Sequence, residues 1–282
     1  MGAGMESLVS AEWLAARLSE PDLRIADCSW FLPGDGRDGL AGYRAGHIPG
    51  AVFLDLAELA DADDPAPMML PPVEKFASRM ARLGLGDGTR IVLYDDSPHH
   101  TAARAWMMMR SFGVPDVAIL DGGLAAWRAG GRPLATGDER PRPRHMTPRA
   151  RRIGVRTLAE MRANLASGAE QVVDARSPAR FAGTTPEPRA GVAPGHIPGS
   201  VNLPHARFFR PDGRWRAPDE IAALFREAGI DPARPIVATC GSGVTASTIA
   251  FAAHLLGHQA AVYDGSWAEW GSDPATPKEI AA

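Results

Sequence analysis

Hydrophobic positions along this chain follow two alternating patterns. Short apolar runs rich in β-branched residues, typical of buried strands, occupy residues 23–28, 52–53, 90–94 and 117–120. Segments with helical periodicity lie between them, at residues 11–18, 73–83 and about 101–112, and residues 61–72 read as a loop. Strands that alternate with helices at this spacing predict an α/β fold, with a parallel open sheet and helices on both faces.

The second half of the chain repeats the first. A Gly-His-Ile-Pro-Gly motif stands at residues 46–50 and again at 195–199, and an Asp-Gly segment ending in tryptophan stands at 121–127 and 264–270. The strand-like runs recur as well, and the offsets between copies vary only from 143 residues (121 to 264) to 149 residues (47 to 196). Each copy is long enough to bury its own core, so the pattern indicates a duplicated domain rather than a short-period solenoid.

A stretch rich in proline and arginine, residues 137–152, separates the two copies. It lacks apolar periodicity, which favours a solvated linker between a first domain at 1–136 and a second at 153–282. Its arginines alone do not indicate a nucleic-acid partner, because the whole chain carries a formal charge of −3.

Composition narrows the setting further. No apolar run is long enough to cross a bilayer, and the start has no basic region leading into an apolar core, so no membrane partner is expected. The two cysteines, Cys28 and Cys240, belong to no CxxC or metal pattern. A free thiol suits a reducing compartment, and we predict a cytoplasmic protein.

Cys240 is the candidate nucleophile. It follows a short apolar run and precedes a glycine-containing loop and a helix-like run at 248–256. Ligands of open α/β sheets collect at such strand ends. The glycines let backbone N–H groups converge into an anion-binding nest, which together with the helix dipole favours the thiolate. The residues expected to supply those groups are Gly241, Ser242, Gly243, Val244, Thr245, Ala246 and Ser247. A buried structural cysteine beside a glycine turn is the alternative.

The two copies differ at this position, because the first holds Asp95 where the second holds Cys240. A carboxylate cannot serve as a sulfur nucleophile, so only the second copy is expected to perform cysteine chemistry, with the first as scaffold. Cys28 is predicted to be a packed core residue. The same core role is expected of Trp127, Trp267 and Trp270.

The paired motifs and the Cys240 loop resemble the rhodanese superfamily in its tandem two-domain form. The resemblance implies sulfur transfer through a Cys240 persulfide, from a small-molecule donor to a thiol such as thioredoxin or to cyanide, without a metal or organic cofactor. The loop wording from Cys240 to Thr245 is similar to members that take sulfur from 3-mercaptopyruvate and release pyruvate. Members that use thiosulfate are expected to carry basic residues where Gly241 and Ser242 stand, which suits a dianion whose charge lies close to the transferred sulfur.

The resemblance also implies substrate and catalytic residues. Arg180 and Arg189 fall on the family's substrate arginines, and a guanidinium fork matches a carboxylate with an adjacent keto oxygen. Ser242, His47 and Asp38 fall on a Ser-His-Asp arrangement beside the cysteine, where the histidine would manage a proton. The alternatives are a pair of surface arginines and a histidine that only holds a turn.

Two other functions stay open at this stage, and a third is disfavoured. A thiosulfate:cyanide sulfurtransferase would use the same fold and nucleophile. A cysteine phosphatase would need an arginine six residues after the cysteine, where Ala246 stands, so this class is disfavoured. A non-enzymatic persulfide carrier would relay sulfur only to a protein partner. A metal site at His254 and His258, four apart on a helix, lacks an evident third ligand and is not expected.

Overall fold

The computed structural model describes residues 5–147, 149 and 154–280. The chain divides into two compact units. Unit 1 consists of Met1–Ala60, Pro71–Arg152 and Arg210–Trp215, and unit 2 of Asp61–Leu70, Ile153–Phe209 and Arg216–Ala282. The boundary that the sequence predicts between residues 152 and 153 lies outside the described residues. The sequence does not predict that Asp61–Leu70 groups with unit 2 or that Arg210–Trp215 groups with unit 1.

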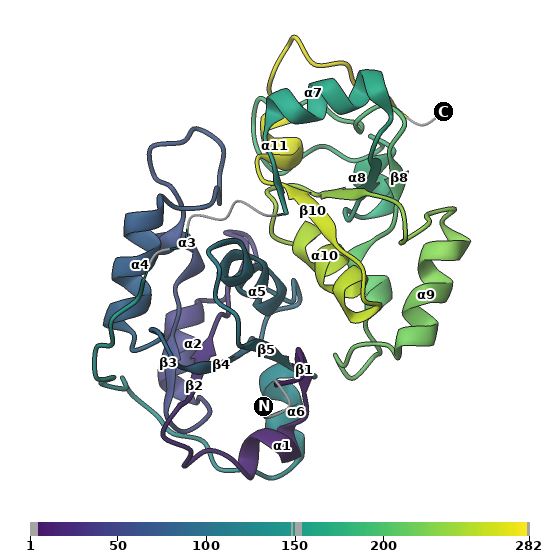
Figure 1. The fold of residues 1–282 in the computed structure, drawn as a ribbon. Helices are drawn as coiled ribbons and strands as arrows, with labels where there is room; N and C mark the ends of the chain where they lie inside the picture. Colours follow the sequence, from purple (N-terminus) through teal and green to yellow (C-terminus); the bar gives the residue numbers. More distant parts are fainter. Residues whose placement is uncertain (1–4, 148, 150–153, 281–282) are drawn as a thin grey trace. The chain divides into compact units, whose positions relative to one another are not determined.

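Unit 1 is a five-stranded, all-parallel sheet in the order β1-β5-β4-β2-β3. Its strands are β1 (Leu8–Val9), β2 (Leu23–Asp27), β3 (Ala51–Phe53), β4 (Arg90–Tyr94) and β5 (Val117–Leu120). Its helices are α1 (Ala11–Ala15), α2 (Gly39–Ala45), α3 (Leu56–Leu59), α4 (Val73–Arg82), α5 (Ala102–Ser111) and α6 (Gly123–Ala129) (Figure 1).

Unit 2 repeats this topology, with the parallel strand order β6-β10-β9-β7-β8. Its strands are β6 (Val155–Arg156), β7 (Gln171–Asp174), β8 (Val201–Asn202), β9 (Ile236–Thr239) and β10 (Ala260–Tyr263). Its helices are α7 (Leu158–Ser167), α8 (Pro178–Phe181), the 3₁₀ turn η1 (His205–Phe208), α9 (Pro218–Glu227), α10 (Ala246–Leu255) and α11 (Ser266–Trp270). The predicted α/β fold with two copies of one parallel sheet is confirmed.

Both faces of each central strand are buried, which explains the unbroken apolar runs in the sequence. In β4, every residue from Ile91 to Tyr94 has no measurable exposure. Val92 and Tyr94 belong to a core shared with α1 and α6, and α5 packs against β4 and β5. In unit 2, α7 and α11 contribute to the equivalent core, and α10 packs against β9 and β10 (Figure 1). The tryptophans predicted to be core residues are buried there: Trp127, Trp267 and Trp270.

Helix α2 is an element that the sequence pattern does not predict, because two glycines interrupt it and a glycine-rich loop precedes it. Tertiary contacts stabilise it instead. The Asp38 carboxylate caps it by accepting from the Ala41 N–H at 2.8 Å, and the buried Tyr43 hydroxyl donates to the Ala51 carbonyl at 2.7 Å. Local propensity is a weak determinant when such contacts are available.

The described part of the predicted linker is not freely solvated. The N–H of Arg144 donates to the Ala81 carbonyl at 2.9 Å, and the N–H of Asp87 donates to the His145 carbonyl at 2.8 Å. Met146 is buried. This stretch is therefore hydrogen-bonded to unit 1. Residues 148 and 150–152 of the predicted linker lie outside the described residues.

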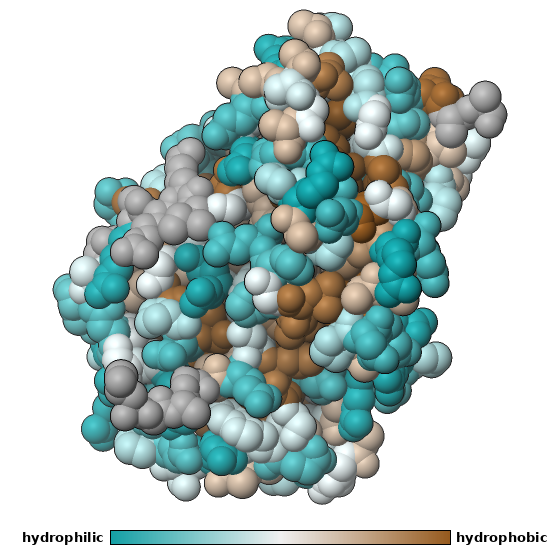
Figure 2. Space-filling model, turned by 45° about the vertical axis from the view of Figure 1, so that its right-hand side comes forward, coloured by the Kyte–Doolittle hydropathy of each residue, from teal (hydrophilic) through white to brown (hydrophobic). Residues whose placement is uncertain are grey.

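Hydrophilic residues cover most of the face drawn in Figure 2. Among the described residues, the large hydrophobic side chains that are exposed are Leu32, Leu134, Leu165 and Ile280. No described helix is long and apolar enough to cross a membrane.

Candidate active site

Cys240 directly follows β9 and precedes the loop that leads into α10. Its side chain is buried, with 2% exposure. Gly243 adopts φ +75°, a conformation that costs other residues energy and that lets the loop turn sharply. The sequence predicts this arrangement of strand, thiol, tight loop and helix, and the structure has it.

Contacts on one side of the loop fix its orientation. The N–H of Trp267 donates to the Cys240 carbonyl at 2.9 Å, and the N–H of Ala268 donates to the Gly241 carbonyl at 2.8 Å. The Ser266 hydroxyl accepts from the Cys240 N–H at 3.2 Å and donates to the Tyr263 carbonyl at 2.8 Å. The N-terminus of α11 thus binds the loop carbonyls, so the loop cannot rotate without losing these bonds.

The loop amides beyond Cys240 are left available. Within the part of the chain that the structure describes, no acceptor is bonded to the N–H groups of Gly241 through Ala246. Ser247 differs from the prediction, because its N–H donates to the Val244 carbonyl at 3.2 Å in the first turn of α10. Buried amides without partners are costly, and an anion at Cys240 is a group that would pair with them.

The first copy shows how such a loop is filled when no thiol is present. The Asp95 carboxylate accepts from the N–H of Ala102 at 2.8 Å and from the N–H of Ser97 at 3.1 Å. The Asp95 carbonyl accepts from the N–H of Leu124 at 3.0 Å, as the Cys240 carbonyl does from its counterpart. Burial raises the pKa of Asp95 to about 7 in spite of those two amides. In unit 1 a side-chain carboxyl group therefore occupies the place that unit 2 leaves open.

Cys28 has the environment of a structural residue, as predicted. It is fully buried, and burial, together with the carboxylates of Asp27 and Asp95, raises the pKa of its thiol well above the usual range. A thiol held in its protonated form is a poor nucleophile.

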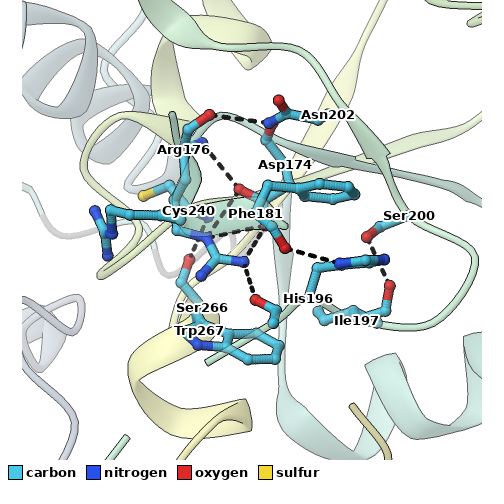
Figure 3. Close-up of polar contacts among 12 residues, drawn as sticks. Asp174, Arg176, Phe181, His196, Ile197, Ser200, Asn202, Cys240, Ser266 and Trp267 are labelled. Carbon is cyan, nitrogen blue, oxygen red and sulfur yellow. Dashed lines mark hydrogen bonds and ion pairs between the residues drawn. The ribbon is translucent and has the colours of Figure 1, made fainter. Parts of the chain in front are cut away.

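A buried arginine lies next to the cysteine loop in unit 2. Arg176 binds both carboxylate oxygens of Asp174, at 2.7 to 3.1 Å, and both side chains are about 1% exposed or less. Its guanidinium also lies 4.6 Å from the centre of the Trp267 ring. Figure 3 shows Arg176 between Asp174 and Trp267, near Cys240. Burial disfavours the charge on Arg176, but its carboxylate partners outweigh burial and raise its pKa.

Of the two predicted substrate arginines, the structure brings one to the loop. A Cβ atom added to Gly241 would lie 3.0 Å from Nη2 of Arg180 and 3.6 Å from its Nη1, so the guanidinium packs on the residue after Cys240. Arg180 is 27% exposed in its side chain and pairs with Glu187. Arg189 is exposed, and no hydrogen bond or ion pair joins it to another described residue.

Of the predicted Ser-His-Asp residues, Ser242 is half-buried in the loop itself, and Asp38 caps α2 as described above. His47 is fully buried. Its Nδ1 lies 2.8 Å from the Tyr43 carbonyl and its ring stacks on the Tyr43 ring at 4.0 Å between centroids. Its Nε2 has no hydrogen-bond partner among the described residues, and the nearest carboxylate, Glu139, is 3.7 Å away.

The twin residue His196 has the same environment. Its Nδ1 lies 2.8 Å from the Phe181 carbonyl, its ring stacks on Phe181 at 3.8 Å, and Glu279 is 3.5 Å from its Nε2. Both histidines also pair through their backbones with a later segment, His47 with Ala135 and His196 with Glu279. This equivalence favours the turn-holding role for His47 that the sequence analysis left open.

Comparison with known proteins agrees with the duplicated fold. Residues 10–130 and 157–273 each match the Rhodanese-like domain. The chain belongs to the rhodanese family. The resemblance seen in the sequence is thus confirmed, and the loop at Cys240 lies in the second of the two matched domains.

Several relatives match this rhodanese over nearly its full length. The 3-mercaptopyruvate sulfurtransferase of Homo sapiens is 44% identical over 271 residues, which cover 94% of this chain and 91% of that protein. The thiosulfate sulfurtransferase of Rattus norvegicus is 40% identical, with the same coverage. The crystal structure of SseA from Escherichia coli, described as a 3-mercaptopyruvate sulfotransferase, superposes with a TM-score of 0.85 at 35% identity and covers 93% of this chain and 99% of that one.

Proposed function

We propose that this rhodanese moves sulfur from 3-mercaptopyruvate to a thiol acceptor through a persulfide on Cys240. The observation that carries the proposal is the Arg180 guanidinium packed against Gly241. The loop from Cys240 to Ser247 contains no lysine or arginine, so its neighbouring cation stands beside the loop rather than in it. The carboxylate of 3-mercaptopyruvate is separated from its sulfur by two carbons, and a cation set back from the nucleophile suits that donor.

In the first step, the Cys240 thiolate attacks the sulfur of 3-mercaptopyruvate. A sulfur–sulfur bond forms, the sulfur–carbon bond breaks, and its electron pair passes to carbon to give the enolate of pyruvate. The proton of the donor's thiol is the one that the enolate carbon gains, so that pyruvate and an anionic persulfide result. Arg180 stabilises the enolate by binding its oxygens, and we assign the same task to the exposed Arg189.

In the second step, an acceptor thiolate attacks the outer sulfur of the persulfide and Cys240 leaves as the thiolate. Between the steps the persulfide carries a negative charge that needs partners in a buried site. The N–H groups of Gly241 through Ala246 are available for it. A small dithiol or a thioredoxin is the proposed acceptor, in a reducing, cytoplasmic compartment that keeps Cys240 free.

The thiosulfate-using alternative is supported by the 40% identical relative and is separated by kinetics. With cyanide as common acceptor, we expect kcat/KM for 3-mercaptopyruvate to exceed that for thiosulfate. A clear preference for thiosulfate would overturn the donor assignment and leave the nucleophile intact.

The persulfide itself is tested by mass spectrometry after exposure to 3-mercaptopyruvate without acceptor. One added sulfur on the peptide that contains Cys240, and none on the Cys28 peptide, is expected. Cys240→Ser should abolish transfer while retaining the fold, because a hydroxyl replaces a buried thiol of similar shape. Turnover of free 3-mercaptopyruvate with release of pyruvate would argue against a non-enzymatic persulfide carrier.

A further inference from the structure

Glu187 lies between two arginines of unit 2 and holds both. Its Oε1 accepts from Nη1 of Arg176 at 2.8 Å and from Nε of Arg180 at 3.3 Å. Its Oε2 accepts from Nη2 of Arg180 at 2.5 Å. The side chain is 4% exposed, although it stands in a proline-flanked loop. A carboxylate of this burial, shared by two guanidinium groups, has a defined position.

Arg176, at the other end of this network, has more polar partners than Arg180. Arg176 is fixed by Asp174 on one edge, by Glu187 on another, and by the Gly195 carbonyl, to which its Nη2 donates at 2.8 Å. Its guanidinium stacks on the Trp267 ring, and the backbone N–H of Trp267 donates to the Cys240 carbonyl. Arg176 therefore connects Trp267, which binds the Cys240 loop, to Glu187, which binds Arg180.

We propose that Glu187 is a positioning residue, which holds the Arg180 guanidinium beside Gly241 in the orientation that receives the carboxylate of the sulfur donor. A free arginine side chain samples many rotamers, and ordering it on binding reduces affinity. Glu187 occupies Nε and Nη2 of Arg180 and leaves Nη1 without a partner among the described residues. The inference rests on the proposed function only in naming the donor's carboxylate as the group received.

The negative charge of Glu187 works against this role, because it repels an anionic donor. Arg176, which also pairs with Asp174, and Arg180 itself both lie against Glu187 and reduce that repulsion, and we expect the orienting effect to exceed what remains. The two effects have opposite signs, and a variant that keeps the charge but withdraws the carboxylate separates them.

Glu187→Asp is that variant, since it shortens the side chain by one carbon–carbon bond of about 1.5 Å. We expect a loss of about 10-fold in kcat/KM for 3-mercaptopyruvate, mostly through KM, which corresponds to weakening one charge-assisted hydrogen bond. The matched control is Glu227→Asp, because Glu227 pairs with Arg207 on an exposed part of α9. It should leave both constants unchanged.

The decisive measurement repeats Glu187→Asp in an Arg180→Ala background. If Glu187 acts through Arg180, the second substitution should change kcat/KM by less than about twofold, whereas independent effects multiply. A full 10-fold loss in both backgrounds, or none in either, would overturn the positioning role. If Glu187→Asp does not fold, Glu187→Gln takes its place in the same cycle. It keeps an acceptor for Arg176 but removes the charge, so a rise in kcat/KM in place of the expected loss would overturn the positioning role.

The cycle is measured with whichever donor the unaltered enzyme uses better. A preference for thiosulfate would therefore refute the donor assignment alone. If the cycle shows no coupling between Glu187 and Arg180, the positioning role alone is refuted, whichever donor is used.

Discussion

The contact between Gly241 and Arg180 predicts that a side chain at position 241 changes the preferred sulfur donor. A Cβ atom there would lie 3.0 Å from Nη2 and 3.7 Å from Cζ of Arg180. Carbon does not normally approach nitrogen so closely, because favourable contacts begin at about 3.5 Å. A Cβ atom at position 241 therefore requires the Arg180 guanidinium to shift by a few tenths of an ångström, which weakens its bond to Glu187.

The size of the effect follows from the charge added. Gly241→Ala only moves the guanidinium, and weakening its charge-assisted hydrogen bond by about 1 kcal/mol raises KM for 3-mercaptopyruvate roughly fivefold. Gly241→Lys adds a cation. Two unit charges about 5 Å apart repel by roughly 3 kcal/mol at an effective dielectric constant of about 20, so Arg180 should leave its position. We then expect a loss of about 10- to 100-fold in kcat/KM for 3-mercaptopyruvate.

Thiosulfate should respond differently to the same substitution. Its charge lies close to the transferred sulfur, and a lysine at 241 places a cation next to the nucleophile, so kcat/KM for thiosulfate should hold or rise. Steady-state rates with both donors and cyanide as acceptor measure the ratio directly. Gly34→Ala is the control, since a Cβ there would meet nothing within 4 Å. An equal decline with both donors would refute the reasoning, because it would indicate general damage to the loop.

Three further predictions concern the scaffold. The pKa of Asp95 is raised to about 7 in the folded chain, so the folded state binds this proton more tightly than the unfolded state does. The stability that results is fully present below about pH 4 and is lost as the pH rises toward 7. By linkage the loss is at most roughly 4 kcal/mol, and Asp95→Asn should flatten denaturant-derived unfolding free energies over this range; an unchanged slope would refute the assignment. Because His47 and His196 have equivalent contacts, His47→Asn and His196→Asn should lower the melting temperature alike with kcat retained, whereas a fall in kcat for His47→Asn alone would restore its catalytic role. Thr157→Ala removes the capping box of α7 and should cost about 1 kcal/mol of unfolding free energy, with no change in either donor's kinetics.

The sequence pattern was most reliable where strands are buried on both faces. The predicted strands at 90–94 and 117–120 coincide with β4 and β5, because a short run that is apolar at nearly every position is typical of a strand covered on both faces. The sequence pattern was least informative for α2. Its two glycines lower the helix propensity, and the helix depends on the contacts of Asp38 and Tyr43. The two-residue edge strands β1, β6 and β8 are too short to show any periodicity.

The sequence alone determined the duplication, the parallel α/β class and the position of Cys240 at a strand end, because each depends on residues that are neighbours in the chain. Only the tertiary structure decided which groups surround that thiol. Arg180 reaches Gly241 across 61 positions of sequence, and the Cys240 amide is held by Ser266, 26 positions away. It also showed that the Glu187 side chain is buried between Arg176 and Arg180, and that the Asp95 carboxylate accepts from the first N–H of helix α5. Such contacts arise from the way strands are ordered in the sheet, which brings the ends of distant segments together and which no local pattern encodes.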